Sequence, residues 1–140
     1  MHKSKSRQDA DIKIPDRRIS ETILDFASIL LDTMEPPVAL TECRSVIQIA
    51  VTIWNAGALA MPIWGSPSHV ANLTSTLEAA PMPLSTRAAI MALQRRRTTQ
   101  FGNDPRAVGE WDVIPDGTGG FRFRCDARLP QEVIRRLSAE

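Results

Sequence analysis

The side chains that could act as nucleophiles or carry protons are few. Apart from His2 near the start, the sequence has one histidine, His69, and two cysteines, Cys43 and Cys125, which lie far apart along the chain. A catalytic thiol needs an imidazole in hydrogen-bond contact and a third group that orients it, and no spacing here brings such groups together. We therefore expect no catalytic residues, and the sequence favours a protein that is not an enzyme.

Metal and cofactor chemistry are not indicated either. The two cysteines match no zinc-ligand spacing and are too few for a disulfide scaffold. The segment Asp116–Gly120 is rich in glycine, but it lacks the Lys-Ser/Thr pair that completes a phosphate-binding loop. We expect no metal, no cofactor and reduced thiols of the kind found in cytoplasmic proteins.

A long uncharged run is the strongest compositional feature. Ser45 to Leu77 contains no Lys, Arg, Asp or Glu, although charged residues make up 24% of the chain. Such a run must be buried in a core, a partner or lipid. Its length would suffice for a membrane span, but Gln48, Asn55 and Pro62 interrupt it and the rest of the chain has amphipathic helical patterns. We expect burial in protein and no membrane association.

One narrow polar stripe crosses the uncharged run. Gln48, Thr52 and Asn55 have helical spacing, and the side chains around them are apolar. Such a stripe is either the solvent-exposed edge of a core helix or the polar lining of a pocket whose other walls are apolar. A ligand or partner site here would consist of Gln48, Thr52, Trp54, Asn55, Trp64 and His69.

Clustered arginines raise the possibility of phosphate binding. Arg95, Arg96 and Arg97 are consecutive, and Arg87 and Arg106 lie near them in sequence. Consecutive residues on a helix point in different directions, and cations are favoured at a helix C-terminus by its dipole. A solvated helix end is therefore the favoured interpretation, and nucleic-acid contact by these five arginines is the alternative.

The helices and strands that would position these groups are predicted from the spacing of apolar residues and from the residues that begin or end helices. Apolar stripes and Pro or Gly boundaries predict helices over residues 19–33, 41–60, 66–80 and 85–101, and a short final helix over 130–138. Ser20 and Ser85 are expected as N-caps, and Gly102 as the residue that ends the fourth helix. Helix 41–60 is apolar nearly all round, so it should be the central one.

Two alternating segments after the helices predict a β-hairpin. Glu110–Ile114 and Phe121–Asp126 alternate apolar and polar residues on either side of the Asp116–Gly120 loop. Two registers keep the apolar face intact, pairing Asp112 with either Arg124 or Arg122. A two-stranded sheet is marginal alone, so its apolar face must pack on the helices or on another chain.

These elements predict an α+β fold, mainly a bundle of about four helices plus the short C-terminal helix, with one C-terminal antiparallel hairpin. Residues 1–18 are polar and basic and predict a disordered arm, and residues 19–140 predict one globular domain.

The sequence favours a small cytoplasmic, non-catalytic protein that acts through protein–protein contacts as a homo-oligomer. The reason is that a helix apolar all round needs neighbours on every side. Two alternatives stay open. One is a nucleic-acid-associated regulator that uses the basic arm and the arginine-rich end of helix 85–101. The other is a small-molecule binder with its pocket beside helix 41–60.

Overall fold

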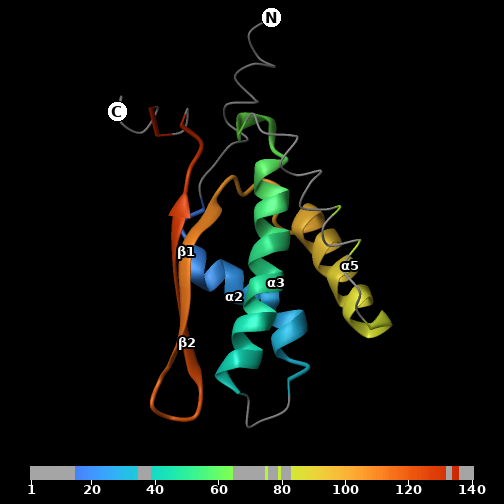
Figure 1. The fold of residues 1–140 in the computed structure, drawn as a ribbon. Coiled ribbons are helices and arrows are strands. Elements are labelled where there is room, and N and C mark those ends of the chain that lie inside the picture. Colours follow the sequence, from blue (N-terminus) through green and yellow to red (C-terminus); the bar gives the residue numbers. More distant parts are fainter. Residues whose placement is uncertain are drawn as a thin grey trace, which may run out of the picture.

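The computed structural model describes residues 15–34, 39–64, 75, 79, 83–131, 134 and 135. Within them the chain forms three α-helices, one short 3-10 helix and two strands, as Figure 1 shows. They are α2 (Ile19–Leu31), α3 (Leu40–Leu59), η1 (Pro62–Trp64), α5 (Leu84–Thr99), β1 (Ala107–Pro115) and β2 (Phe121–Arg128).

The predicted α+β architecture is confirmed, with three α-helices in the described residues where about four were predicted. Of the predicted helix over 66–80, only residues 75 and 79 are described, and of that over 130–138 only residues 130, 131, 134 and 135. The amide of Ile134 donates to the Pro130 carbonyl at 3.1 Å, a helix-type bond. Ile134 is 47% exposed and therefore lies outside the core.

Helix α3 is central, as predicted. It stands in the middle of Figure 1 with the hairpin on one side and α5 on the other, and α2 crosses behind it. It packs against α2, α5 and β1. Its buried side chains are Cys43, Ile47, Ala50, Val51, Ile53, Trp54 and Ala58. The neighbours that an apolar helix needs are therefore supplied by its own chain.

The predicted helix ends were off by a residue or more. Both α2 and α5 begin one residue before the expected serine caps, so Arg18 and Pro83 occupy the N-cap positions without a side-chain cap. Helix α5 ends at Thr99, and Gly102 has no positive φ. Just beyond the end of α5, the buried Arg97 side chain binds the carbonyl of Phe101.

The hairpin adopts the first of the two predicted registers. Asp112 lies opposite Arg124, and Val113 lies opposite Phe123. Val113 and Phe123 are buried against the helices, and the polar residues of both strands face solvent. Figure 1 shows the sheet on one flank with a single face toward the helices. The packing partner that the prediction required is thus the chain's own helical layer.

A bulge interrupts the pairing, which the sequence pattern did not predict. The register shifts between Val108 and Trp111, so Gly109 and Glu110 together oppose Asp126. A Cβ on Gly109 would lie 2.9 Å from the Asp126 Oδ1 atom and 2.8 Å from the Nε atom of Arg128. A side chain at position 109 would therefore have to displace two exposed side chains of β2.

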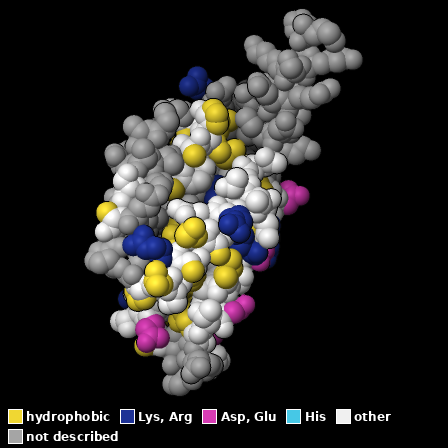
Figure 2. Space-filling view, turned by 90° about the vertical axis from the view of Figure 1, so that its right-hand side faces the viewer, with side chains coloured by type: hydrophobic (Ala, Val, Ile, Leu, Met, Phe, Trp, Pro, Cys, Tyr) yellow, Lys and Arg dark blue, Asp and Glu magenta, His cyan; other side chains and the backbone are white. Residues whose placement is uncertain are grey.

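The flank that carries α5 exposes a few large apolar side chains. Leu84 is 85% exposed and Met91 is 59% exposed. Figure 2, which views this side of the molecule, shows hydrophobic side chains lying between charged and polar ones. Single exposed apolar residues are normal on protein surfaces, so this flank offers no defined site.

Candidate functional site

The polar stripe of α3 is directed at the edge of β1. The Asn55 Nδ2 group donates to the Val108 carbonyl at 3.0 Å, and the Val108 amide donates to Asn55 Oδ1 at 2.7 Å. A side-chain amide carries the same donor and acceptor as a peptide group. Asn55 therefore completes the hydrogen bonding of this edge position as a neighbouring strand would.

Two tryptophans hold the chain just before β1. The Trp54 indole N–H donates to the Arg106 carbonyl at 2.8 Å, and the Trp64 indole N–H donates to the Pro105 carbonyl at 2.7 Å. Trp54 is fully buried and meets the rings of Phe26 and Phe101 edge-on. Among the proposed pocket residues, Trp54, Asn55 and Trp64 are thus brought together on one segment, 105–108, whose backbone they bind.

The other proposed pocket residues do not join them. The Thr52 hydroxyl donates to the Gln48 carbonyl at 2.8 Å, and the Gln48 side-chain amide lies 3.4 Å from that hydroxyl, so both bond within α3. Gln48 is exposed and Thr52 is half-buried. His69 lies outside the described residues. The helical spacing correctly identified a row of polar side chains on α3. Nothing in the sequence indicated that the edge of a strand lies opposite Asn55.

Arg97 is buried, so its interpretation as part of a solvated helix end is wrong. It is 3% exposed, and its guanidinium donates to the carbonyls of Trp54, Phe101 and Asp104. The guanidinium carbon lies 3.9 Å from the centroid of the Trp54 ring, close enough for a cation–π contact. Burial lowers the pKa of Arg97 to about 10, with opposing effects from Asp104 and Arg106.

Arg106 is buried as well, in an ion pair with Asp104. Its Nε and Nη2 atoms donate to the two carboxylate oxygens at 3.0 and 2.7 Å. Its remaining donors bind the Arg17 carbonyl at 2.7 Å and the Thr22 hydroxyl at 3.3 Å. Arg106 therefore ties the start of α2 to the start of β1, and the end of the predicted arm at Arg17 contacts the fold; residues 1–14 lie outside the described residues.

The other three arginines are placed differently. Arg96 is half-buried and donates to the carbonyl and carboxylate of Asp25 on α2 at 3.1 and 3.0 Å. Arg95 is exposed, and Arg87 is half-buried with an interaction partner. A phosphate could reach Arg97 or Arg106 only after their protein partners were displaced. The predicted nucleic-acid surface is therefore reduced to scattered positions, and binding itself stays a prediction.

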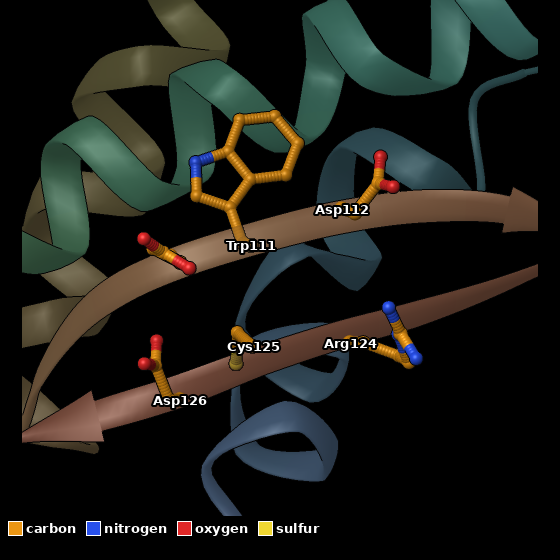
Figure 3. A pocket seen from close by; sticks show the side chains of 6 residues that line it. Trp111, Asp112, Arg124, Cys125 and Asp126 are labelled. Atoms are coloured by element: carbon orange, nitrogen blue, oxygen red, sulfur yellow. The ribbon is translucent and has the colours of Figure 1, made fainter.

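A shallow polar hollow of about 390 Å³ lies on the hairpin (Figure 3). Figure 3 shows Trp111 extending from β1 toward α3, with the acids and the arginine spread along the two strands. The lining residues are Glu110, Trp111, Asp112, Arg124, Cys125 and Asp126. No group of three potential ligands that could hold a metal ion occurs among the described residues. The lining of the hollow is therefore mostly charged side chains from the two strands.

Neither thiol is activated. Burial raises the pKa of Cys43, and burial together with the charge of Asp126 raises the pKa of Cys125 to about 11. A nucleophilic cysteine needs the opposite shift, toward the thiolate at neutral pH. These two side chains behave as structural thiols in the fold described here.

The edge of β1 that faces away from β2 is bound by side chains at Val108 and Val113. The Val113 amide donates to the Asp112 carboxylate at 2.8 Å, and the Val113 carbonyl accepts from Arg44 Nη2 at 3.1 Å. Asn55 binds both backbone groups of Val108 further along the same edge. Pro115, two residues beyond Val113, has no amide hydrogen that would need a partner.

The outer edge of β2 is open within the described residues. Backbone direction alternates along an antiparallel pair, so the groups of Phe123, opposite Val113, must point away from β1. By the same alternation, those of Phe121, Cys125 and Ala127 also point outward. In the described part of the chain, no group outside the hairpin hydrogen-bonds to these positions. This edge is the feature of the surface best suited to binding another chain.

Comparison with protein-family models, with curated proteins and with solved structures gave no match. A search of the described helices for segments long and apolar enough to cross a bilayer found none.

Proposed function

We propose that this chain is a small, non-catalytic cytoplasmic protein that acts by binding protein, and that its partner is a second copy of itself. The observation that supports the proposal is the open outer edge of β2, with four outward-facing backbone positions from Phe121 to Ala127. An edge of this kind is a template for strand addition. The unpaired thiols Cys43 and Cys125 fit a reducing compartment.

The edge of the hairpin, and not helix α3, is the feature that favours self-association. The sequence pointed to α3 as a helix in need of neighbours, but α3 packs against α2, α5 and β1 of its own chain. Among the described residues, the outer edge of β2 in the two-stranded sheet is the place without a neighbouring strand. Sheets of two strands are marginal in isolation, and a third or fourth strand stabilises them.

The experiment is a measurement of molar mass by light scattering and sedimentation equilibrium over a wide range of protein concentration. The expected result is a concentration-dependent shift from the 15.5 kDa monomer toward twice that mass. A strictly monomeric chain up to about millimolar concentration, where an affinity of only ~4 kcal/mol would still be visible, would contradict self-association.

The structure does not favour the nucleic-acid alternative. The exposed arginines of β2 that face solvent, Arg122, Arg124 and Arg128, share the hairpin surface with Glu110, Asp112 and Asp126. Equal numbers of opposite charges cancel the field that would attract a phosphate backbone. For the small-molecule alternative, Trp54 and Asn55 already bind the chain's own backbone, so a ligand at these two side chains would have to displace those bonds.

A further inference from the structure

We propose that Asp116, in the loop between β1 and β2, is a site of spontaneous isomerisation to isoaspartate, and that the folded loop restrains this reaction. The inference is independent of the proposed function. Asp116 is the only aspartate in the sequence that is followed by glycine. An aspartate isomerises when the next amide nitrogen attacks its side-chain carboxyl carbon, and glycine at the next position has no side chain to block the attack.

The reaction has two steps and needs no reagent except water. The Gly117 nitrogen forms a bond to Cγ of Asp116 and loses its proton, and the carboxyl OH leaves as water, which gives a five-membered cyclic imide. Water then adds at the backbone carbonyl carbon of Asp116, whose bond to the nitrogen breaks. Gly117 is now joined to Cγ, so the main chain is one carbon longer and the carboxylate is attached directly to Cα.

The attacking nitrogen is accessible. Gly117 is exposed, and a Cβ placed on it would have nothing within 4 Å. In the described part of the chain, the Gly117 amide makes no hydrogen bond. Nothing described around this nitrogen therefore shields it, so the restraint on the reaction must come from the carboxyl group that it attacks.

Three donors hold that carboxyl group. Oδ1 of Asp116 accepts from the Thr118 hydroxyl at 2.7 Å, from the Thr118 amide at 2.8 Å and from the Gly120 amide at 3.1 Å. The Thr118 hydroxyl, together with the two amides and the charge of Arg122, lowers the pKa of Asp116. The imide forms from the neutral acid, because the acid can lose OH as water and the carboxylate cannot. Donors that favour the ionised form therefore slow the reaction.

The loop itself is built around this carboxylate. Besides the three bonds to Oδ1, the Asp116 amide donates to the Gly120 carbonyl at 3.2 Å, next to the strand pair Pro115–Phe121. In isoaspartate, the longer main chain and the displaced carboxylate would remove the acceptor that Thr118 and Gly120 share. Isomerisation should therefore loosen the loop and fray the end of the hairpin that adjoins it.

The experiment measures isoaspartate at position 116 in the full chain by peptide mapping with mass spectrometry. The natural chain is incubated for several weeks at neutral pH, folded in buffer and unfolded in guanidinium chloride. The unfolded chain should accumulate isoaspartate severalfold faster than the folded one, because unfolding removes all three donors. Thr118→Val removes only the hydroxyl bond, and in the folded chain it should speed the reaction by about threefold to tenfold.

The matched control is Thr118→Ser, which keeps the hydroxyl and should isomerise at the rate of the natural chain. Thr118 is exposed, and circular dichroism checks that both variants remain folded. The same digests contain Asp126, followed by Ala127, where the methyl group should keep isomerisation far below that at Asp116. Acid provides a second readout: once Asp116 is protonated in the natural chain as well, the rates of the natural chain and Thr118→Val should converge.

Each part of the proposal has an outcome that overturns it. If the unfolded chain forms no isoaspartate at Asp116, the site is wrong. If the folded natural chain reacts as fast as the unfolded one, the loop does not restrain the reaction. If Thr118→Val reacts at the natural rate, or Thr118→Ser reacts as fast as Thr118→Val, the restraint does not come from the hydroxyl bond.

Discussion

Replacing Gly57 by alanine should destabilise the protein, although alanine is the better helix former. A Cβ at position 57 would lie 2.4 Å from Cγ and 2.8 Å from Nε of Arg97. The clash involves the base of the Arg97 side chain, so the guanidinium must shift away from the three carbonyls that it binds. In a helix interior, alanine is more stabilising than glycine by about 1 kcal/mol. Overpacking lowers the free energy of unfolding by ~1–3 kcal/mol, and weakening hydrogen bonds from a charged donor lowers it by ~1.5–3 kcal/mol.

The expected net effect of Gly57→Ala is therefore a loss of about 1–3 kcal/mol in the free energy of unfolding. Arg97→Ala alone should cost about 3 kcal/mol or more, because it removes three hydrogen bonds from a buried charged donor. In the Arg97→Ala background the new methyl group meets no arginine. The same glycine substitution should then stabilise the protein by about 0.5–1 kcal/mol.

Urea unfolding followed by circular dichroism measures the stability of the natural chain, the two single variants and the double variant, which together form a double-mutant cycle. Ser45→Ala serves as the control, since Ser45 is an exposed α3 residue that bonds only within the helix. It should change stability by only a few tenths of a kcal/mol. Additive effects of the glycine and arginine substitutions, or stabilisation by Gly57→Ala in the natural chain, would refute the close packing of Arg97 on α3.

Three further predictions concern separate contacts. Asn55→Ala should lower the free energy of unfolding by about 2 kcal/mol and speed amide hydrogen exchange at Val108, and unchanged exchange there would contradict this prediction. In a dimer joined through β2, the same substitution should permit higher oligomers because it opens the second sheet edge. Asp104→Ala should cost about 3–5 kcal/mol by leaving a buried guanidinium unpaired, measured by urea unfolding against Asp32→Ala at an exposed site. Because the pKa of Cys125 is raised in the folded state, the protein should lose stability as pH rises from about 9 toward 11, and Cys125→Ser should remove that part of the loss. The rate of Cys125 alkylation should keep rising to about pH 11, and a rate that levels off near pH 9 would be inconsistent with burial of the thiol.

The hairpin could be predicted from the sequence because its information is local. Alternation fixes which residues share a face, and the acid–base pair Asp112–Arg124 belonged to one of only two compatible registers. The bulge was not predictable in the same way. It depends on the side chains of Asp126 and Arg128 lying over Gly109, which are contacts between strands.

The role of Arg97 was missed although a signal was present. Ile90, Leu93 and Arg97 have helical spacing and are the buried residues of α5, so Arg97 continues the apolar stripe. Its position in a run of three arginines made a solvated surface the simpler interpretation. Only the structure shows that Gly57 leaves room for the stem of the side chain and that carbonyls at the end of α5 accept its donors.

The helices beside the hairpin explain why its two edges differ. Helix α3 packs along β1 and presents a polar stripe, so Asn55 and Arg44 reach the strand's backbone. Helix α2 packs against β2 with an apolar face, and its polar groups are used elsewhere: Asp25 binds Arg96 and the Thr22 hydroxyl accepts from Arg106. In the described residues, no side chain of α2 hydrogen-bonds to the backbone of β2. Asn55, one residue of the polar stripe that resembled a ligand site in the sequence, and Arg44 thus bind backbone groups at the β1 edge. No α2 side chain in the described part of the chain does the same for β2, whose outer edge is open to a partner.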